Sequence, residues 1–272
     1  MVERIVPGEP EWDEFSAHHL ARYLFAAQQT QGCRVLDAGS GSGYGARIMR
    51  TAGAASVTGV DLDPQAVQWA AQRFGGEGVD FQVGDCQALD RMAGPFDLIT
   101  NFENLEHLRQ PERFLEAAGR LLDPHGRLLV STPDRAASPP WVAGRPRNKF
   151  HFQEWYREEF ATLLRKHFAE VEIWVQVESR SLQCRRAAVD ALRQGLLWAN
   201  PLTILAWRKW PPGEKRRRAW KQLAGLAAPA PGDYPILPAA TAPLLGTSAF
   251  HLAVCRQPLT ARSSGSVRNS PL

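Results

Sequence analysis

Short apolar runs separated by polar and glycine-rich turns mark out alternating strands and helices along the first 177 residues. Runs of β-branched and other apolar residues predict strands at 34–38, 56–61, 79–83, 96–100 and 126–132. Apolar residues spaced three or four apart predict helices at 14–27, 46–52, 64–74, 111–122 and 153–167. Strands and helices that alternate in this way build a mostly parallel sheet with helices on both faces, so we expect an α/β fold.

The alternation stops after residue 177. A strand is predicted at 170–177 and a last one at 249–255, but between them lies one helical pattern (182–198), followed by basic, tryptophan-rich and then proline-rich sequence. We therefore expect one domain made of residues 1–177 and 249–256, interrupted by an insertion at 178–248. The polar segment 257–272 has no apolar periodicity and is predicted to be a disordered tail.

The composition is that of an ordinary soluble globular protein, because 44% of the residues are hydrophobic and 22% are charged. The four cysteines have no C-x-x-C spacing, which favours free thiols in a reducing compartment over a zinc site or a disulfide framework. The N-terminus has no apolar signal region, and no stretch approaches the roughly 18 apolar residues of a membrane span. We therefore expect a cytoplasmic protein.

The stretch Arg34-Val-Leu-Asp-Ala-Gly-Ser-Gly-Ser-Gly-Tyr-Gly45 predicts a strand, a tight turn and the start of a helix. Glycine has no Cβ, so it permits positive φ and lets a ligand lie against bare backbone. The turn also presents its N–H groups and the N-terminus of the helix to that ligand. Phosphate, dinucleotide and adenosyl ligands all use such turns, so this motif alone does not identify the ligand.

Several further motifs follow along the chain and narrow the choice of ligand for the glycine-rich turn. Asp61 ends the predicted strand at 56–61, and Gly84-Asp85-Cys86 follows the strand at 79–83. Segment 96–107 contains the next predicted strand and the residues after it, and segment 121–130 contains the turn that leads into the strand at 126–132. Together with the glycine-rich turn, this ordered set resembles the class I S-adenosylmethionine-dependent methyltransferases that act on small molecules or glycans. A nicotinamide dinucleotide is the rival cofactor, because it also uses a glycine-rich turn. Its fingerprint is G-x-G-x-x-G, whereas the glycine spacing from Gly39 here also admits G-x-G-x-G.

The resemblance implies a Rossmann-like, seven-stranded, mostly parallel sheet with an antiparallel last strand and a helical lid. It implies S-adenosylmethionine as the cofactor and S-adenosylhomocysteine as its product. Asp61 would accept from the ribose hydroxyls and Asp85 from the adenine amine, while Asp37 would organise the turn or reach the ammonium through water. The cofactor-binding residues that we expect are Asp37, Ala38, Gly39, Ser40, Gly41, Gly43, Asp61, Leu62, Asp85, Cys86, Asn101 and Arg22, the last facing the cofactor carboxylate.

Each of these assignments has a plainer alternative. The alternative for Asp37, Asp61 and Asp85 is a simple helix N-cap or turn residue. The alternative for Arg22 is a surface arginine.

Transfer of a methyl group to an oxygen atom requires removal of the hydroxyl proton, usually by His, Asp or Glu. His107 follows the strand at 96–100, and His151 lies on the loop before the next helix, so both are expected on the substrate side of the fold. The alternative for each is a structural histidine bonded to backbone. Substrate contacts are expected from Glu103, Tyr23 and Phe150, whereas Glu106 is interpreted as a helix-start carboxylate. No carboxylate–carboxylate–Asn cluster resembles the magnesium site of catechol-type enzymes, so we expect no metal.

Residues 180–221 hold eleven Arg or Lys against two acidic residues, with four tryptophans among them. We rank a cap over the substrate pocket first, contact with an anionic membrane surface second and nucleic acid third. Membrane contact would make the protein peripheral to the membrane, and exposed tryptophans would suit a homodimer interface.

The predicted function is methyl transfer from S-adenosylmethionine to a hydroxyl of a small molecule or glycan. The alternatives are N- or C-methylation of a natural product or an RNA base, and a non-catalytic module that binds the nucleoside for regulation.

Overall fold

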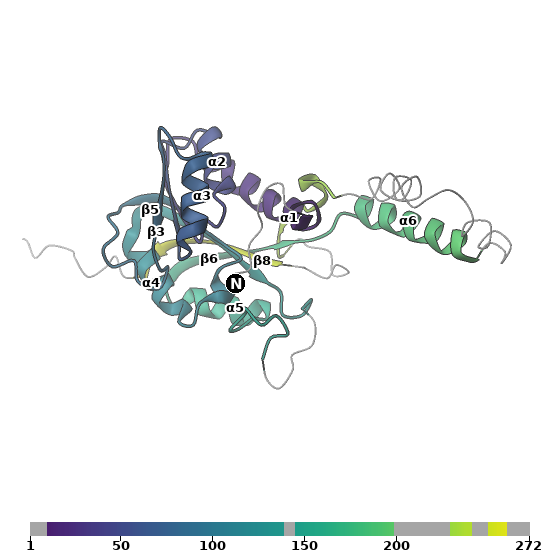
Figure 1. Ribbon diagram of the computed structural model, residues 1–272. Helices are drawn as coiled ribbons and strands as arrows, with labels where there is room; N and C mark the ends of the chain where they lie inside the picture. Colours follow the sequence, from purple (N-terminus) through teal and green to yellow (C-terminus); the bar gives the residue numbers. More distant parts are fainter. Residues whose placement is uncertain (1–9, 139–144, 199–228, 241–249, 260–272) are drawn as a thin grey trace, which may run out of the picture.

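The computed structural model describes residues 10–138, 145–198, 229–240 and 250–259, which form a sheet of eight strands between two layers of helices (Figure 1). The strand order is β3-β2-β1-β4-β5-β8-β6-β7. The first five strands are parallel, and β8 is antiparallel to both of its neighbours, β5 and β6. The α/β class and the antiparallel last strand predicted from the sequence are therefore confirmed.

The strands are β1 (Arg34–Ala38), β2 (Ser56–Asp61), β3 (Val79–Val83), β4 (Phe96–Phe102), β5 (Leu122–Pro133), β6 (Phe168–Gln176), β7 (Ile236–Pro238) and β8 (Phe250–Pro258). The helices are α1 (Pro10–Ala27), α2 (Tyr44–Thr51), α3 (Pro64–Phe74), α4 (Pro111–Leu121), α5 (Arg157–Arg165) and α6 (Arg180–Trp198). Two short 3-10 turns complete the described elements, η1 (Leu105–His107) and η2 (Pro231–Asp233).

Several element bounds differ from the sequence-based expectation; β5, for example, begins at Leu122 rather than at residue 126, and α1 begins at Pro10 rather than at residue 14. The sheet has one strand more than expected, because residues 236–238 of the predicted insertion form β7 and pair with β6. The helix expected from residue 153 begins only at Arg157, after Tyr156 in extended backbone. Pro258 pairs with Phe168, so the first residues of the expected tail belong to the sheet. Residues 260–272 of that tail and residues 199–228 and 241–248 of the predicted insertion, which include residues 199–221 of the basic stretch, lie outside the described residues.

The two faces of the sheet are both buried, which explains why its strands are apolar at successive positions. Leu36 and Ile99 pack with α4 and α5 on one face, whereas Val35 and Leu98 pack with α1, α2 and α3 on the other. Side chains alternate between the faces of a strand, so each strand contributes to both layers. This arrangement fixes the register of the central strands and aligns their carboxyl ends at one edge.

The parallel strand order reverses between β1 and β4, from which β2 and β5 lead away to opposite sides. In an open α/β sheet the crevice outside such a switch point is the usual ligand site. The turn after β1 and the end of β4 therefore lie where a ligand is expected. No helix in the described part of the chain is long and apolar enough to cross a membrane.

Helices α1 and α2 approach each other closely through Tyr23 and Gly45. Tyr23 is buried, and its ring meets those of Tyr44 and Phe102 edge to face, with centroids 5.3 and 5.1 Å away. A Cβ added at Gly45 would lie 2.1 Å from the Tyr23 ring. The position therefore requires glycine for packing, even though glycine is unfavourable in a helix.

We predict that Gly45→Ala destabilises the protein by roughly 1–3 kcal/mol, because the methyl group overpacks the Tyr23 ring. Alanine is favoured over glycine in a helix by about 1 kcal/mol, so a net loss requires that packing outweighs propensity. Urea unfolding followed by circular dichroism measures the change. Arg47→Ala, at an exposed position of the same helix, is the control and should stay within about 0.5 kcal/mol of wild type. A stabilised Gly45→Ala variant would contradict the prediction.

Candidate functional site

A cavity of about 1210 Å³ lies at the carboxyl ends of the parallel strands. It is bounded by α1, by the loops after β1 to β5 and by the segment 147–154. Typical ligand sites measure roughly 300–1,000 Å³, so this space is large enough for a cofactor and a small second molecule. Twelve residues singled out from the sequence line it: Tyr23, Gly39, Ser40, Gly41, Asp61, Leu62, Asp85, Cys86, Glu103, His107, Phe150 and His151.

The glycine-rich turn forms the part of the wall nearest to β1. Gly39, Gly41 and Gly43 all have positive φ, at 81°, 52° and 80°. A Cβ at Gly39 would lie 2.6 Å from Cγ of Asn104, whereas one at Gly41 would meet nothing within 4 Å. Gly41 therefore exposes bare backbone to the open cavity, and a ligand can lie directly against it.

Asp61 ends β2 and is fixed by two backbone N–H groups. Its Oδ2 accepts from the N–H of Gly41 at 2.8 Å, and its Oδ1 accepts from the N–H of Asp63 at 3.0 Å. Each carboxylate oxygen has further acceptor capacity, which suits a pair of ribose hydroxyls. Leu62 beside it is 67% exposed and lines the cavity, so it offers an apolar surface for a ring.

Asp85 and Cys86 follow β3 on the same side. The Asp85 Oδ1 accepts from the backbone N–H of Gln87 at 2.8 Å, so this carboxylate also stabilises its own turn. Burial raises the pKa of the Cys86 thiol to about 12, which leaves it protonated and unreactive at neutral pH. Both the ligand-binding and the turn-forming interpretation of Asp85 therefore fit its position.

Five of the sequence-predicted residues do not line the cavity: Asp37, Ala38, Gly43, Asn101 and Arg22. Asp37 accepts from the hydroxyls of Thr100 at 2.8 Å and Tyr23 at 3.2 Å. Asn101 donates from Nδ2 to the carbonyl of Ala38 at 2.9 Å. These buried groups hold the turn from behind, as expected if Asp37 organises it.

Arg22 is fully buried, so the alternative of a surface arginine is wrong. Its Nη1 donates to Oε1 of Gln176 at 2.5 Å, and its guanidinium lies 4.5 Å from the centroid of the Phe250 ring. Its Nη2 is 3.8 Å from Oε1 of Glu103, beyond hydrogen-bond distance, and Nε and Nη2 have no hydrogen-bond partner among the described residues. A buried cation with unsatisfied donors is costly unless an anion pairs with it.

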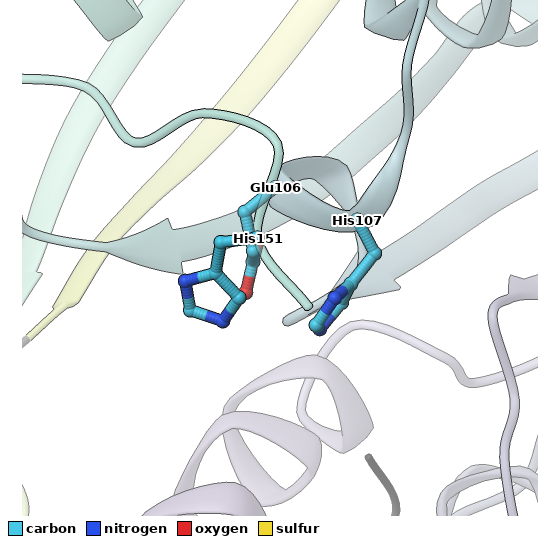
Figure 2. A group of neighbouring side chains, drawn as sticks. All are labelled: Glu106, His107 and His151. Carbon is cyan, nitrogen blue, oxygen red and sulfur yellow. The ribbon is translucent and has the colours of Figure 1, made fainter. Parts of the chain in front are cut away.

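The segments 105–107 and 148–152 are joined by two hydrogen bonds that bring three polar side chains together. The N–H of Phe152 donates to the carbonyl of Glu106 at 2.8 Å, and Nδ1 of His107 donates to the carbonyl of Phe150 at 3.0 Å. The rings of His107 and His151 then meet edge to face with centroids 4.9 Å apart. Figure 2 shows both rings beside the carboxylate of Glu106.

The hydrogen-bond partners of each histidine indicate which ring nitrogen carries the proton. Because Nδ1 of His107 donates to a carbonyl, Nε2 carries the lone pair in the neutral ring. His151 contacts Oε1 of Glu154 through Nδ1 at 2.7 Å, and Nδ2 of Asn148 donates to its Nε2 at 2.9 Å. His107 is thus bonded to backbone, as the structural interpretation proposed, and lines the cavity as well.

Glu106 is part of this group, which the sequence interpretation did not anticipate. It lies in the first turn of η1, as a helix-start carboxylate does, but it is 1% exposed and accepts from the Thr132 hydroxyl through Oε2 at 3.0 Å. Its other oxygen, Oε1, has no hydrogen-bond partner among the described residues. Burial raises the pKa of Glu106 well above its usual range, and the nearby charge of Glu103 adds to this.

Glu103 adopts a backbone conformation that few residues other than glycine adopt, with φ at 51°. Ser131 holds it there: the Ser131 hydroxyl donates to Oε1 of Glu103 at 3.0 Å, and the Glu103 N–H donates to the Ser131 carbonyl at 3.3 Å. Such strain costs about 1–3 kcal/mol and is concentrated at functional sites.

The sequence interpretation also missed several residues that line the cavity. His18 stacks on the Phe250 ring at 5.1 Å, and burial lowers its pKa to about 3, so it is neutral. Glu178, Arg186 and Tyr234 come from the predicted insertion and line the cavity as well. The periodicity of α1 marks a buried face but not which histidine faces a ligand, so no sequence signal separated His18 from a core residue.

The geometry agrees with the match to known proteins. Residues 12–174, more than half of the chain, match the sequence model of the methyltransferase domain. The chain belongs to the class I S-adenosylmethionine-dependent methyltransferases. This methyltransferase therefore uses S-adenosylmethionine as its cofactor.

Two relatives and one solved structure illustrate the match. A probable S-adenosylmethionine-dependent methyltransferase of Mycolicibacterium smegmatis is 35% identical over 62% of this chain, which spans 65% of that relative's length. A ubiquinone biosynthesis O-methyltransferase of Xanthomonas oryzae is 35% identical over 55% of this chain and 68% of its own. The structure of a possible histamine N-methyltransferase of Thermotoga maritima shares the fold, with a TM-score of 0.56, 17% identity and coverage of 91% and 93%.

The described residues of the methyltransferase fit this cofactor. Gly41 exposes bare backbone to the cavity, Asp61 presents a fixed carboxylate, and Arg22 has buried N–H donors without a hydrogen-bond partner among the described residues. An amino-acid carboxylate is the kind of anion that such a guanidinium binds most strongly. We propose that Asp61 contacts the ribose of the cofactor and that Arg22, which lies behind the cavity wall, reaches the cofactor carboxylate when the cofactor binds.

We predict that Arg22→Met weakens binding of S-adenosylmethionine by roughly 10- to 100-fold, since hydrogen bonds to charged groups contribute about 1.5–3 kcal/mol. Isothermal titration measures this directly. Decarboxylated S-adenosylmethionine is the matched ligand: it should bind wild type and Arg22→Met with nearly equal affinity. Equal losses for both ligands would assign Arg22 a purely structural role through Gln176.

We predict that the stability of the wild type falls relative to Asp37→Asn as the pH rises from about 4 to about 7. Burial raises the pKa of Asp37 from 3.8 to about 7, so in this window the folded state binds a proton that the unfolded state has lost. The difference reaches at most about 4 kcal/mol. Urea unfolding at several pH values measures it. Asp80→Asn, at an exposed position, should run parallel to wild type, and a parallel curve for Asp37→Asn would contradict the prediction.

Proposed function

We propose that this methyltransferase transfers a methyl group to a hydroxyl oxygen of a small-molecule acceptor. The observation that carries the proposal is the position of His107 and His151 on the wall of the same cavity as the glycine-rich turn and Asp61. Nitrogen nucleophiles with a lone pair need no such group, whereas a hydroxyl must lose its proton. The similarity to ubiquinone biosynthesis O-methyltransferases supports the same acceptor atom.

S-adenosylmethionine supplies the methyl group: the S–CH3 bond breaks with its electron pair left on sulfur, a C–O bond forms, and the hydroxyl proton is released. The residues of the chain position the two reactants and manage that proton. The turn at Gly41 and the carboxylate of Asp61 hold the cofactor, which leaves the side of the cavity near His107 for the acceptor. Alignment of this kind contributes several kcal/mol to displacement reactions.

Contacts to the acceptor are assigned to residues that line the remaining wall. Tyr23, Glu103 and Phe150 line the same cavity as the glycine-rich turn and the two histidines. Phe150 is half-buried and offers a ring face, while Glu103 offers a carboxylate to a second hydroxyl. We therefore expect a hydroxylated molecule with an apolar or aromatic part.

Labelled methyl transfer tests the proposal. The full chain is incubated with methyl-labelled S-adenosylmethionine and separate pools of phenols, other hydroxylated small molecules, glycans, RNA and protein. We expect label in the phenol or small-molecule pools, attached through oxygen. Label confined to RNA, to protein or to a nitrogen atom would contradict the proposal. Cofactor binding with no transfer to any pool would favour the non-catalytic binding module.

We predict that His107→Ala and His151→Ala each lower kcat for the identified acceptor by at least about 100-fold, because loss of the proton is then unassisted. Binding of S-adenosylhomocysteine should change less than about threefold, since the cofactor residues lie elsewhere on the wall. Steady-state kinetics and isothermal titration give the two values. His125 is an exposed histidine of β5, so His125→Ala is the matched control and should retain wild-type kinetics.

A further inference from the structure

Glu106, His107 and His151 form a compact group of potential metal ligands. One carboxylate oxygen and one nitrogen from each ring all lie within 4.8 Å of one another. The ligands come from two separate segments, η1 and the loop at 148–152, which the hydrogen bonds between Glu106 and Phe152 and between His107 and Phe150 hold together. All three residues line the cavity, so an ion has access to them (Figure 2).

The Nδ1 atoms of the two histidines already make the kind of hydrogen bond that histidine metal ligands usually make. Histidine ligands commonly donate their second N–H to a carbonyl or a carboxylate, which fixes the ring and its tautomer. The Nδ1 atom of His107 donates to the Phe150 carbonyl, and Nδ1 of His151 bonds to Glu154, itself 6% exposed. With Nδ1 of each ring bound in this way, Nε2 is the nitrogen that would face an ion, and the amide of Asn148 that now bonds to Nε2 of His151 must shift.

Glu106 supplies an independent observation. Its carboxylate is 1% exposed, and Oε2 is held by the Thr132 hydroxyl, yet Oε1 has no hydrogen-bond partner among the described residues. Buried polar atoms without a partner are rare in folded proteins, and they point to a missing water or ion. In Figure 2 this carboxylate lies on the same side as the two imidazole rings.

We propose that Glu106, His107 and His151 bind a divalent transition-metal cation of the Zn²⁺ class. Two imidazole nitrogens and one carboxylate oxygen form a three-ligand set that leaves a fourth position open. Ligand atoms in a tetrahedral Zn²⁺ site lie about 3.3 Å apart, so the three side chains, whose ligand atoms lie within 4.8 Å of one another, must draw together by up to about 1.5 Å on binding. The sequence predicted no metal because it lacks the carboxylate–carboxylate–Asn pattern of the catechol-type site, which is a different donor set.

The role of the cation rests on the proposed function. The open position takes the hydroxyl oxygen of the acceptor, and the cation lowers the pKa of that hydroxyl. The proton passes to water, and the resulting oxyanion forms the C–O bond as the S–CH3 bond breaks. His107 and His151 thus assist loss of the proton through the ion that they hold, and binding of the ion does not itself require an acceptor.

Metal uptake by the untagged full chain tests the site without any acceptor. The protein is stripped with a chelator, dialysed against Zn²⁺ and analysed for bound metal by atomic emission, and Co²⁺ titration followed by visible absorption reports the ligand field. We expect about one Zn²⁺ per chain in wild type and in His125→Ala. We expect at least a tenfold weaker affinity in His107→Ala and in His151→Ala, with the Co²⁺ absorption lost.

Glu154→Gln tests the supporting hydrogen bond, since the amide keeps the size of the side chain but weakens the acceptor for His151 Nδ1. Loss of such a partner usually lowers metal affinity by 10- to 100-fold. Unchanged binding of S-adenosylhomocysteine and an unchanged circular dichroism spectrum show that each variant is folded. No Zn²⁺ uptake by wild type, or equal uptake by wild type and both histidine variants, would overturn the metal site.

The outcomes for the site and for the reaction can be told apart. Methyl transfer to a hydroxyl that persists at full rate in excess chelator would contradict the role of the cation in the reaction and would still support the proposed function. Uptake of one Zn²⁺ that depends on both histidines, without transfer to any hydroxyl, would establish the site and contradict the proposed function.

Discussion

The buried polar contacts behind the turn after β1 are the interaction on which the site depends. Thr100 and Asn101 stand on β4 and bond to Asp37 and to the carbonyl of Ala38 on β1. Tyr23 adds a bond from α1 to the same carboxylate. Because each of these groups is buried, loss of one partner leaves another unsatisfied, at a cost of about 1–3 kcal/mol. The network therefore fixes the turn in one conformation before any ligand arrives.

Sequence patterns were sufficient for the central part of the fold. The predicted bounds of β1, β2, α3 and β3 agree with the structure, because buried parallel strands and a proline-initiated helix give strong local signals. The strand β7 was missed because it has only three residues, and its pairing with β6 is set by the sheet edge rather than by periodicity. The start of α5 was misplaced because Trp155 pairs with Asp134 instead of joining the helix.

The candidate site also has a part that the sequence predicts and a part that it does not. Residues within one motif, such as Gly41 and Asp61, were predictable because the motif itself brings them together. The association of His107 with His151 was not, since it depends on hydrogen bonds between segments more than forty residues apart. Glu106 illustrates the limit most clearly: its sequence neighbours indicate a helix start, and only tertiary packing makes it a buried carboxylate near two imidazole rings.

The position of β8 has a consequence for how the chain folds during synthesis. This strand is the last of the described strands in the sequence, yet it lies between β5 and β6 and pairs with both along most of its length. While residues 250–258 are still within the ribosome, β6 lacks the strand that links it to β5, although the five parallel strands can already pair with one another. The half of the sheet that carries β6 must therefore assemble late, and a truncation that removes β8 would leave two unpaired edges open to aggregation.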